Sequence, residues 1–115
     1  MLLNFSNHSF DKWDKLQQEN ALSNFHEVVD MTFPMIDPEA NDIEIDLLVE
    51  DYFTEIKKLI PQAIHIMGEL TFTYRMVSRL KNAGFNCIAS TTKRNVTEKD
   101  GAKVSRFEFV KFRDY

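Results

Sequence analysis

The chain has 115 residues, of which 43% are hydrophobic and 28% charged, so it can bury the core of one domain, residues 1–115, and is too short for two. Its formal net charge of −4 argues against a protein that coats long nucleic acid through net charge alone. A single cysteine, Cys87, excludes an internal disulfide and a multi-cysteine zinc site.

The N-terminal part of the chain predicts a strand and a helix. Residues 1–5 form a short apolar run that ends in the polar residues 6–9, which is typical of a buried strand leading into a loop. Ser9 is the expected N-cap of the helix, because apolar and amide side chains recur at helical spacing from Phe10 to Ala21.

A second strand and a long helix are expected next. Residues 27–33 are rich in β-forming side chains, and Pro34 ends this strand because it has no N–H to donate. Asn41 and Glu44 have the spacing of a capping box. An apolar stripe over residues 45–60 then indicates the helix.

The same alternation continues toward the C-terminus. Residues 63–67 form a third short apolar run, and residues 71–83 a helical stripe with Gly84 placed to end it. Residues 85–90 supply a fourth strand. The chain thus reads β-α-β-α-β-α-β, which favours a parallel sheet with helices on both faces.

The last segment predicts a β-hairpin that turns at Asp100-Gly101, with residues 91–97 continuing the fourth strand and residues 103–113 returning antiparallel. The expected fold class is therefore α/β: a Rossmann-like three-layer sandwich, with a mainly parallel sheet and a C-terminal antiparallel β-hairpin. The final strand is apolar on both faces for part of its length, at residues 107–112, which is a candidate dimer interface.

Three polar loops follow predicted parallel strands, and open α/β sheets bind ligands outside the carboxyl ends of their strands. In the first loop, Ser6, Asn7 and Ser9 offer hydroxyl and amide groups to phosphate or sugar oxygens. His8 is a candidate donor or general base. The alternative is that the two serines only shape a turn and cap a helix.

The second loop contains Gly68, Glu69, Thr71 and Thr73. Gly68 permits close approach of a ligand to the backbone, and the two threonines begin a helix whose dipole favours an anion. Glu69 is a candidate base or ribose ligand, or else a solvated turn carboxylate. The absence of G-x-G-x-x-G and Walker A patterns argues against the familiar dinucleotide and nucleoside-triphosphate sites.

The third loop contains Thr92, Lys93 and Arg94 and begins a basic segment. Residues 93–115 hold seven basic and four acidic side chains, while residues 1–92 hold seven basic and fourteen acidic ones. Eight acids between residues 37 and 55 are expected on a solvated helix face that points elsewhere. Arg94 is the preferred phosphate ligand, because a guanidinium binds phosphate in a bidentate fork. The alternative is a surface arginine.

Other polar residues are expected to be structural. His65 lies between two isoleucines and is predicted to be a core histidine with satisfied hydrogen bonds, and Cys87 to be buried and inert. The three histidines are too scattered to propose a metal site, so none is expected. No apolar run approaches the roughly 20 residues of a membrane span, and the first residues lack the basic start of a signal peptide. A cytoplasmic protein without membrane contact is expected.

Three short motifs resemble a known family. They are Leu-Leu-Asn-Phe-Ser-Asn-His at residues 2–8, Met-Gly-Glu at 67–69 and Ser-Thr-Thr-Lys-Arg at 90–94. Together they resemble the small CRISPR-associated Rossmann-fold (CARF-like) proteins of type III antiviral systems. The resemblance implies a homodimer that binds cyclic oligoadenylate across its two-fold crevice. Some members, called ring nucleases, also cleave it without a metal; otherwise the chain would sequester the ligand or pass the signal to a partner, and no cofactor is expected. The ligand contacts it implies are Ser6, Asn7, His8, Gly68, Glu69, Thr71, Thr92 and Arg94.

Two classes of function therefore compete. In the first, the ligand is a small anion such as a cyclic oligonucleotide, Arg94 and the backbone near Gly68 stabilise charge, and His8 or Glu69 moves a proton. In the second, the chain is a non-catalytic module that binds a ligand in the crevice or a protein through the hairpin. A binder of long nucleic acid is disfavoured by the overall acidity.

Overall fold

The computed structural model describes residues 1–115 and confirms the expected fold class. Strands and helices alternate up to the fourth strand, and the last two strands form the hairpin. In chain order the elements are β1 (Leu2–Ser6), the 3₁₀ helix η1 (Phe10–Lys12), α1 (Lys15–Phe25), β2 (Val28–Thr32), α2 (Asp42–Leu59), β3 (Ala63–Met67), α3 (Leu70–Asn82), β4 (Cys87–Lys99) and β5 (Ala102–Asp114).

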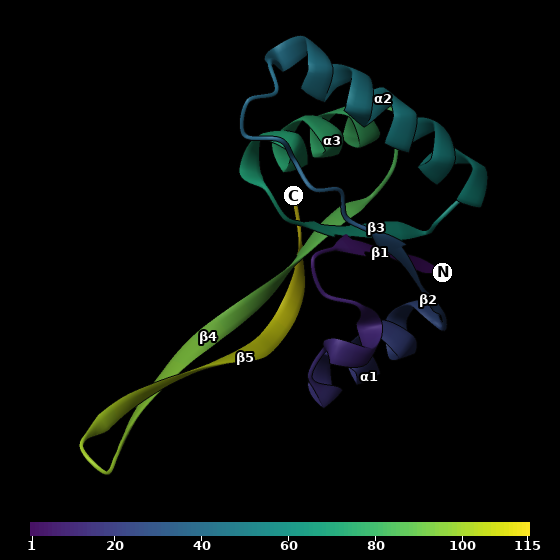
Figure 1. The fold of residues 1–115 in the computed structure, drawn as a ribbon. Helices are drawn as coiled ribbons and strands as arrows, with labels where there is room; N and C mark the ends of the chain where they lie inside the picture. The colour runs from purple at the N-terminus through teal and green to yellow at the C-terminus, as the bar shows by residue number, and fades with distance from the viewer.

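The five strands form one sheet in the order β2-β1-β3-β4-β5. The first four are parallel, with Phe5 of β1 aligned to Met31 of β2 and to Ile66 of β3, and β5 is antiparallel to β4. Helix α1 covers one face of the sheet, and α2 and α3 cover the other (Figure 1). This arrangement follows from right-handed crossovers, because the chain leaves β1 in one direction along the sheet and leaves β3 in the other.

Each face of the sheet buries its own core, and the two cores differ in size. The core under α2 and α3 contains 14 buried residues, including the fully buried rings of Phe5 and Phe72. The core under α1 contains five, among them Leu2 and Trp13. Burial of apolar surface is the main stabilising term in folding, so most of the stability lies on the α2/α3 side.

Several helix ends match their sequence signals. Asn41 and Glu44 form a complete capping box at the start of α2. At the end of α3 the C-cap is Ala83, and Gly84 follows it with a φ of 90°. The end of α2 is marked in the sequence by Pro61 and not by a glycine. There Ile60 adopts the left-handed conformation (φ 48°, ψ 56°), which a β-branched side chain rarely takes.

The predicted start of the first helix is wrong. Ser9 precedes the single turn η1 and makes no capping bond to its backbone. The α-helix begins at Lys15, where the carboxylate of Asp14 accepts a hydrogen bond from the amide of Gln17. The break lies at Trp13, whose extended backbone (φ −69°, ψ 152°) separates the two helices. The indole packs on the sheet, and its Nε1 donates to the carbonyl of His8.

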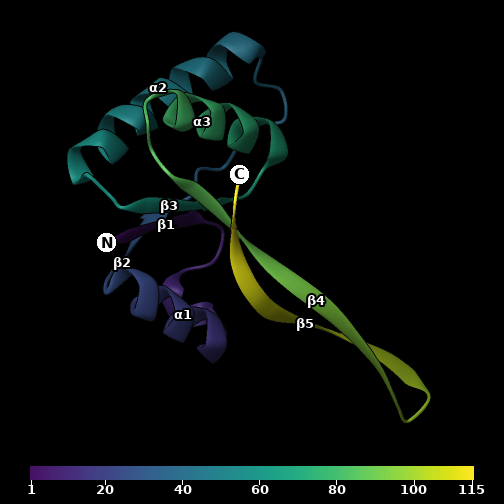
Figure 2. The ribbon, with the colours of Figure 1, turned by 180° about the vertical axis from the view of Figure 1, so that it is seen from behind.

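The hairpin of β4 and β5 extends well beyond the sheet (Figures 1 and 2). It turns at Asp100 (φ 54°) and Gly101 (φ 77°), the two positive φ angles of a tight hairpin turn. The radius of gyration is 15.8 Å, against about 13 Å for a compact chain of this length. We call residues 93–107 the arm.

None of the helices has the length and apolar composition that a membrane span requires.

Candidate functional site

A pocket of about 550 Å³ lies at the carboxyl ends of β1 and β3, beside the part of β4 that follows its pairing with β3. It lies where the sheet order reverses, between β1, whose following helix packs on one face, and β3, whose following helix packs on the other. Ligands of open α/β sheets bind at such reversal points. We call it the switch-point pocket. Its lining residues are Ser6, Asn7, His8, Trp13, Gln17, His65, Met67, Gly68, Ser90, Thr92 and Phe107.

All three predicted loops contribute to this pocket, but only some of the predicted residues do. Ser6, Asn7 and His8 come from the first loop, Gly68 from the second and Thr92 from the third. Glu69, Thr71, Thr73, Ser9, Lys93 and Arg94 lie elsewhere.

A buried polar network forms part of the pocket wall. Asn4 is 1% exposed, and its Nδ2 donates to Asp30 Oδ1 and to the carbonyl of His8, both at 2.8 Å. Its Oδ1 accepts a hydrogen bond from Ser6 Oγ at 2.7 Å and lies 3.0 Å from His65 Nδ1. The other ring nitrogen of His65, Nε2, is buried without a partner. The prediction of a fully satisfied core histidine is therefore only half right.

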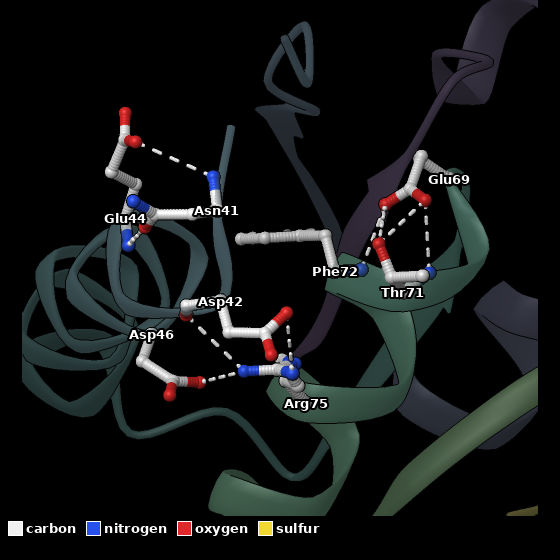
Figure 3. A network of polar contacts seen from close by, with 8 residues as sticks. All are labelled: Asn41, Asp42, Glu44, Asp46, Glu69, Thr71, Phe72 and Arg75. Carbon is white, nitrogen blue, oxygen red and sulfur yellow. Dashed lines mark hydrogen bonds and ion pairs between the residues drawn. The ribbon is translucent and has the colours of Figure 1, made fainter. Parts of the chain in front are cut away.

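The second loop uses its polar groups on its own helix. The carboxylate of Glu69 accepts hydrogen bonds from the amides of Thr71 and Phe72 and from the Thr71 hydroxyl (Figure 3). These bonds, chiefly the one from the Phe72 amide, hold the pKa of Glu69 below its usual value. A carboxylate thus already occupies the N-terminus of α3, where the sequence suggested a site for a ligand's anion. Thr73 is 7% exposed, and its hydroxyl has no partner.

Gly68 was expected to let a ligand approach the backbone, but the group that lies close to it is the Phe33 ring. A Cβ at this position would lie 2.2 Å from the ring of Phe33. Any larger residue would therefore push that ring out of the core, where it stacks edge-on against Phe72 with centroids 5.4 Å apart. The packing of Phe33 is sufficient to explain the glycine.

The acidic side chains of α2 were expected to be solvated, but three of them form ion pairs with arginines of α3. Arg75 of α3 pairs with Asp42 and Asp46 at 3.2 and 2.7 Å (Figure 3), and Arg79 pairs with Glu50 at 2.6 Å. These pairs join the two helices on the outside of the larger core. Exposed pairs of this kind contribute little free energy each, but they neutralise three of the eight acids.

The third loop separates its threonine from its cations. Thr92 lies at the pocket, whereas Lys93 and Arg94 lie on the arm. The guanidinium of Arg94 donates to Ser105 Oγ across the hairpin, at 2.8 and 3.1 Å. Within one chain, Arg94 therefore does not line the switch-point pocket.

A smaller pocket of about 210 Å³ adjoins the first, and both are lined by Ser6 and Asn7. It also contains Ser9, the ammonium-bearing Lys12 and Asp30. The Asp30 carboxylate already accepts bonds from Asn4 and from the amide of Phe10. Lys12 is thus the one lysine or arginine that lines either pocket.

The comparison with protein families gives one match, which spans residues 1–113 and is to the Uncharacterized protein MJ1673 family. The chain belongs to this family. Neither a curated protein nor a solved structure matches it.

Sequence reasoning missed several pocket residues of this MJ1673-family chain. Trp13 and Gln17 reach the pocket only because the helix breaks at Trp13, and Phe107 reaches it because the hairpin twists over α1. Lys12 was not predicted as a site residue, because residues 10–21 were expected to form one regular helix. Ser90 lies in the 90–94 motif that carries the resemblance, but it was not predicted as a ligand contact.

Proposed function

We propose that the chain binds a nucleotide in the switch-point pocket, with cyclic oligoadenylate as its specific ligand. The observation that carries the proposal is that polar residues at the ends of β1 and β3, and Ser90 and Thr92 of β4, line one pocket where the sheet order reverses. The resemblance of residues 2–8, 67–69 and 90–94 to CARF-like proteins supports the choice of ligand.

The lining of the two pockets suits the parts of a nucleotide. Trp13 and Phe107 offer aromatic faces on which a base stacks. Asn7 and Thr92 offer amide and hydroxyl groups to a ribose. Lys12 lies in the adjoining pocket, which shares Ser6 and Asn7 with the first, and is the cation for a phosphate.

The proposal includes cleavage of the ligand without a metal. A ribose 2′-hydroxyl gives up its proton, its oxygen attacks the adjacent phosphorus, and the 5′-oxygen leaves and takes up a proton. The product is a 2′,3′-cyclic phosphate. His8 is the residue proposed to move the proton, because it lines the pocket and an imidazole nitrogen can accept or donate a proton.

Trp13 makes the binding step directly measurable, since it is the single tryptophan of the chain and lines the pocket. We expect cyclic tetra-adenylate, added with EDTA, to change its fluorescence saturably. Asn7→Ala should weaken this binding, whereas Asn82→Ala, at the end of α3 and outside this pocket, should not. No change with cyclic oligoadenylates of any ring size, or equal effects of the two variants, would overturn the binding proposal.

The cleavage step is tested separately by chromatography of the same mixtures. Linear product with a cyclic phosphate end should form with the native chain and be lost with His8→Ala, while binding is kept. Bound ligand that is recovered intact would reject cleavage and leave a binding protein.

A second candidate function is association through the arm, and exposure favours it. Phe107, Val96 and Val104 are 66%, 52% and 49% exposed, and a two-stranded hairpin is only marginally stable alone in water. We propose that a second copy of the chain covers this surface. The mass in solution, measured by light scattering, should be twice 13.5 kDa and should halve with Val104→Lys. A monomer at every concentration would reject this candidate.

A further inference from the structure

His65 is the least explained polar residue of the molecule. It is 2% exposed, its ring lines the switch-point pocket, and its Nε2 has no hydrogen-bond partner. A buried acceptor or donor without a partner is costly and rare in folded proteins. Such a group in a pocket wall is a candidate contact for a ligand.

The network around Asn4 fixes which nitrogen of His65 carries the proton. The amide of Asn4 is oriented by its two acceptors, Asp30 Oδ1 and the carbonyl of His8, both of which require the Nδ2 donor. Asn4 therefore presents Oδ1 to His65, and the imidazole must donate to it from Nδ1. In the neutral ring Nε2 is then an acceptor.

The surroundings of the ring keep it neutral. The rings of Trp13 and Phe112 pack edge-on against it, with centroids 5.1 and 5.6 Å away. Desolvation by this burial lowers the pKa of His65 to about 4. At neutral pH the His65 ring is thus uncharged and presents a hydrogen-bond acceptor at Nε2.

We infer that His65 is the specificity-determining residue of the pocket and that it selects ligands whose bound group donates a hydrogen bond, such as a base with an exocyclic amino group. This inference rests on the proposed nucleotide site. Nε2 is buried in the structure, so a ligand reaches it only when the pocket wall around His65 shifts. A base with a carbonyl at the same position brings two acceptors together and is rejected.

The test compares cyclic tetra-adenylate with its inosine counterpart, in which each amino group is replaced by a carbonyl. The native chain should bind the adenine compound at least about tenfold more tightly. His65→Leu removes the acceptor and should bring the two affinities within about twofold of each other. Thr92→Val, which alters the same pocket without touching His65, should weaken both ligands and keep their ratio.

A second measurement avoids dependence on the folding of the variants. In the native chain labelled with ¹⁵N, the Nε2 resonance of His65 should shift on saturation with cyclic tetra-adenylate, while Nδ1 keeps its proton. Equal affinity for the two compounds, or an unmoved Nε2 resonance at saturation, would overturn the inference. Failure of both compounds to bind would instead reject the proposed function.

Discussion

Asn4 and His65 lie opposite one another on the neighbouring strands β1 and β3, with Oδ1 of the amide 3.0 Å from Nδ1 of the imidazole. The pair joins the two strands whose ends form the switch-point pocket. Through Asn4 it also reaches Asp30 on β2. Three adjacent strands are thus connected by side chains at the place where a ligand is proposed to bind.

Asn4→Ala should be strongly destabilising. It leaves the buried Nδ1 of His65 without its partner, which costs about 1–3 kcal/mol, and it removes the bonds of Asn4 to Ser6, to the His8 carbonyl and to Asp30. We expect the free energy of unfolding, measured with urea, to fall by about 3 kcal/mol. Asn24→Ala, on the exposed face of α1, should change it by less than about 0.5 kcal/mol. Equal losses would contradict the structural role of the network.

Stability should depend on pH through His65. Burial lowers its pKa from 6.5 to about 4, so between these values the unfolded chain binds a proton that the folded chain does not. The free energy of unfolding therefore falls as the pH is lowered through this interval, by about 3 kcal/mol in total. Urea unfolding at a series of pH values should give a shallower dependence for His65→Gln. Identical slopes would show that other groups are responsible.

Lys12 and Arg94 should differ in their effect on ligand binding. Lys12 adjoins the pocket, whereas Arg94 donates to Ser105 on the arm. Lys12→Ala should weaken the binding of cyclic tetra-adenylate about tenfold and reduce its dependence on salt. Arg94→Ala should change the affinity less than about twofold, as should Lys57→Ala on α2. The contrary outcome is that Arg94→Ala weakens binding more than this at high protein concentration, with the difference from the native chain disappearing when both proteins are diluted. That result would mean that a second copy of the chain supplies the arginine.

Ile60→Gly should stabilise the protein. Ile60 holds a left-handed conformation at the end of α2 while 82% exposed, so glycine removes the strain and loses little buried surface. The gain should be about 1 kcal/mol, seen as a higher Tm. The matched control is Ile43→Gly in the first turn of α2, where the side chain is also exposed and glycine should cost about 1 kcal/mol. A lower Tm for both variants would contradict the strain at Ile60.

The sequence was sufficient for the fold because its signals are local. The capping box at Asn41 and the turn at Asp100-Gly101 depend on spacing alone, and both occur as predicted. The alternation of strands and helices then leaves few topologies, since crossovers are right-handed. The start of α1 was misplaced because Ser9 and Asp14 are both good caps, and the packing of Trp13 on the sheet decides between them.

The site was only partly predictable for a related reason. The rule for carboxyl ends of strands identifies Ser6, Asn7 and Gly68, since their positions follow from the sheet. It does not say where a side chain points once the loop is built, so Glu69 was expected at a ligand and lies on its own helix. Burial of His65 was predicted from its neighbours, but its missing partner depends on distant residues such as Asn4 and Trp13.

The unequal cores bear on how a ligand enters. The layer formed by η1 and α1 rests on five buried residues, against 14 beneath α2 and α3, and it includes Trp13 and Gln17 of the pocket wall. Local unfolding is least costly where the fewest apolar contacts are lost. Amide hydrogens of α1 should therefore exchange with solvent faster than those of α3, and binding should slow this exchange. We therefore expect a ligand to enter the pocket by local opening of η1 and α1, while the sheet, α2 and α3 keep their positions.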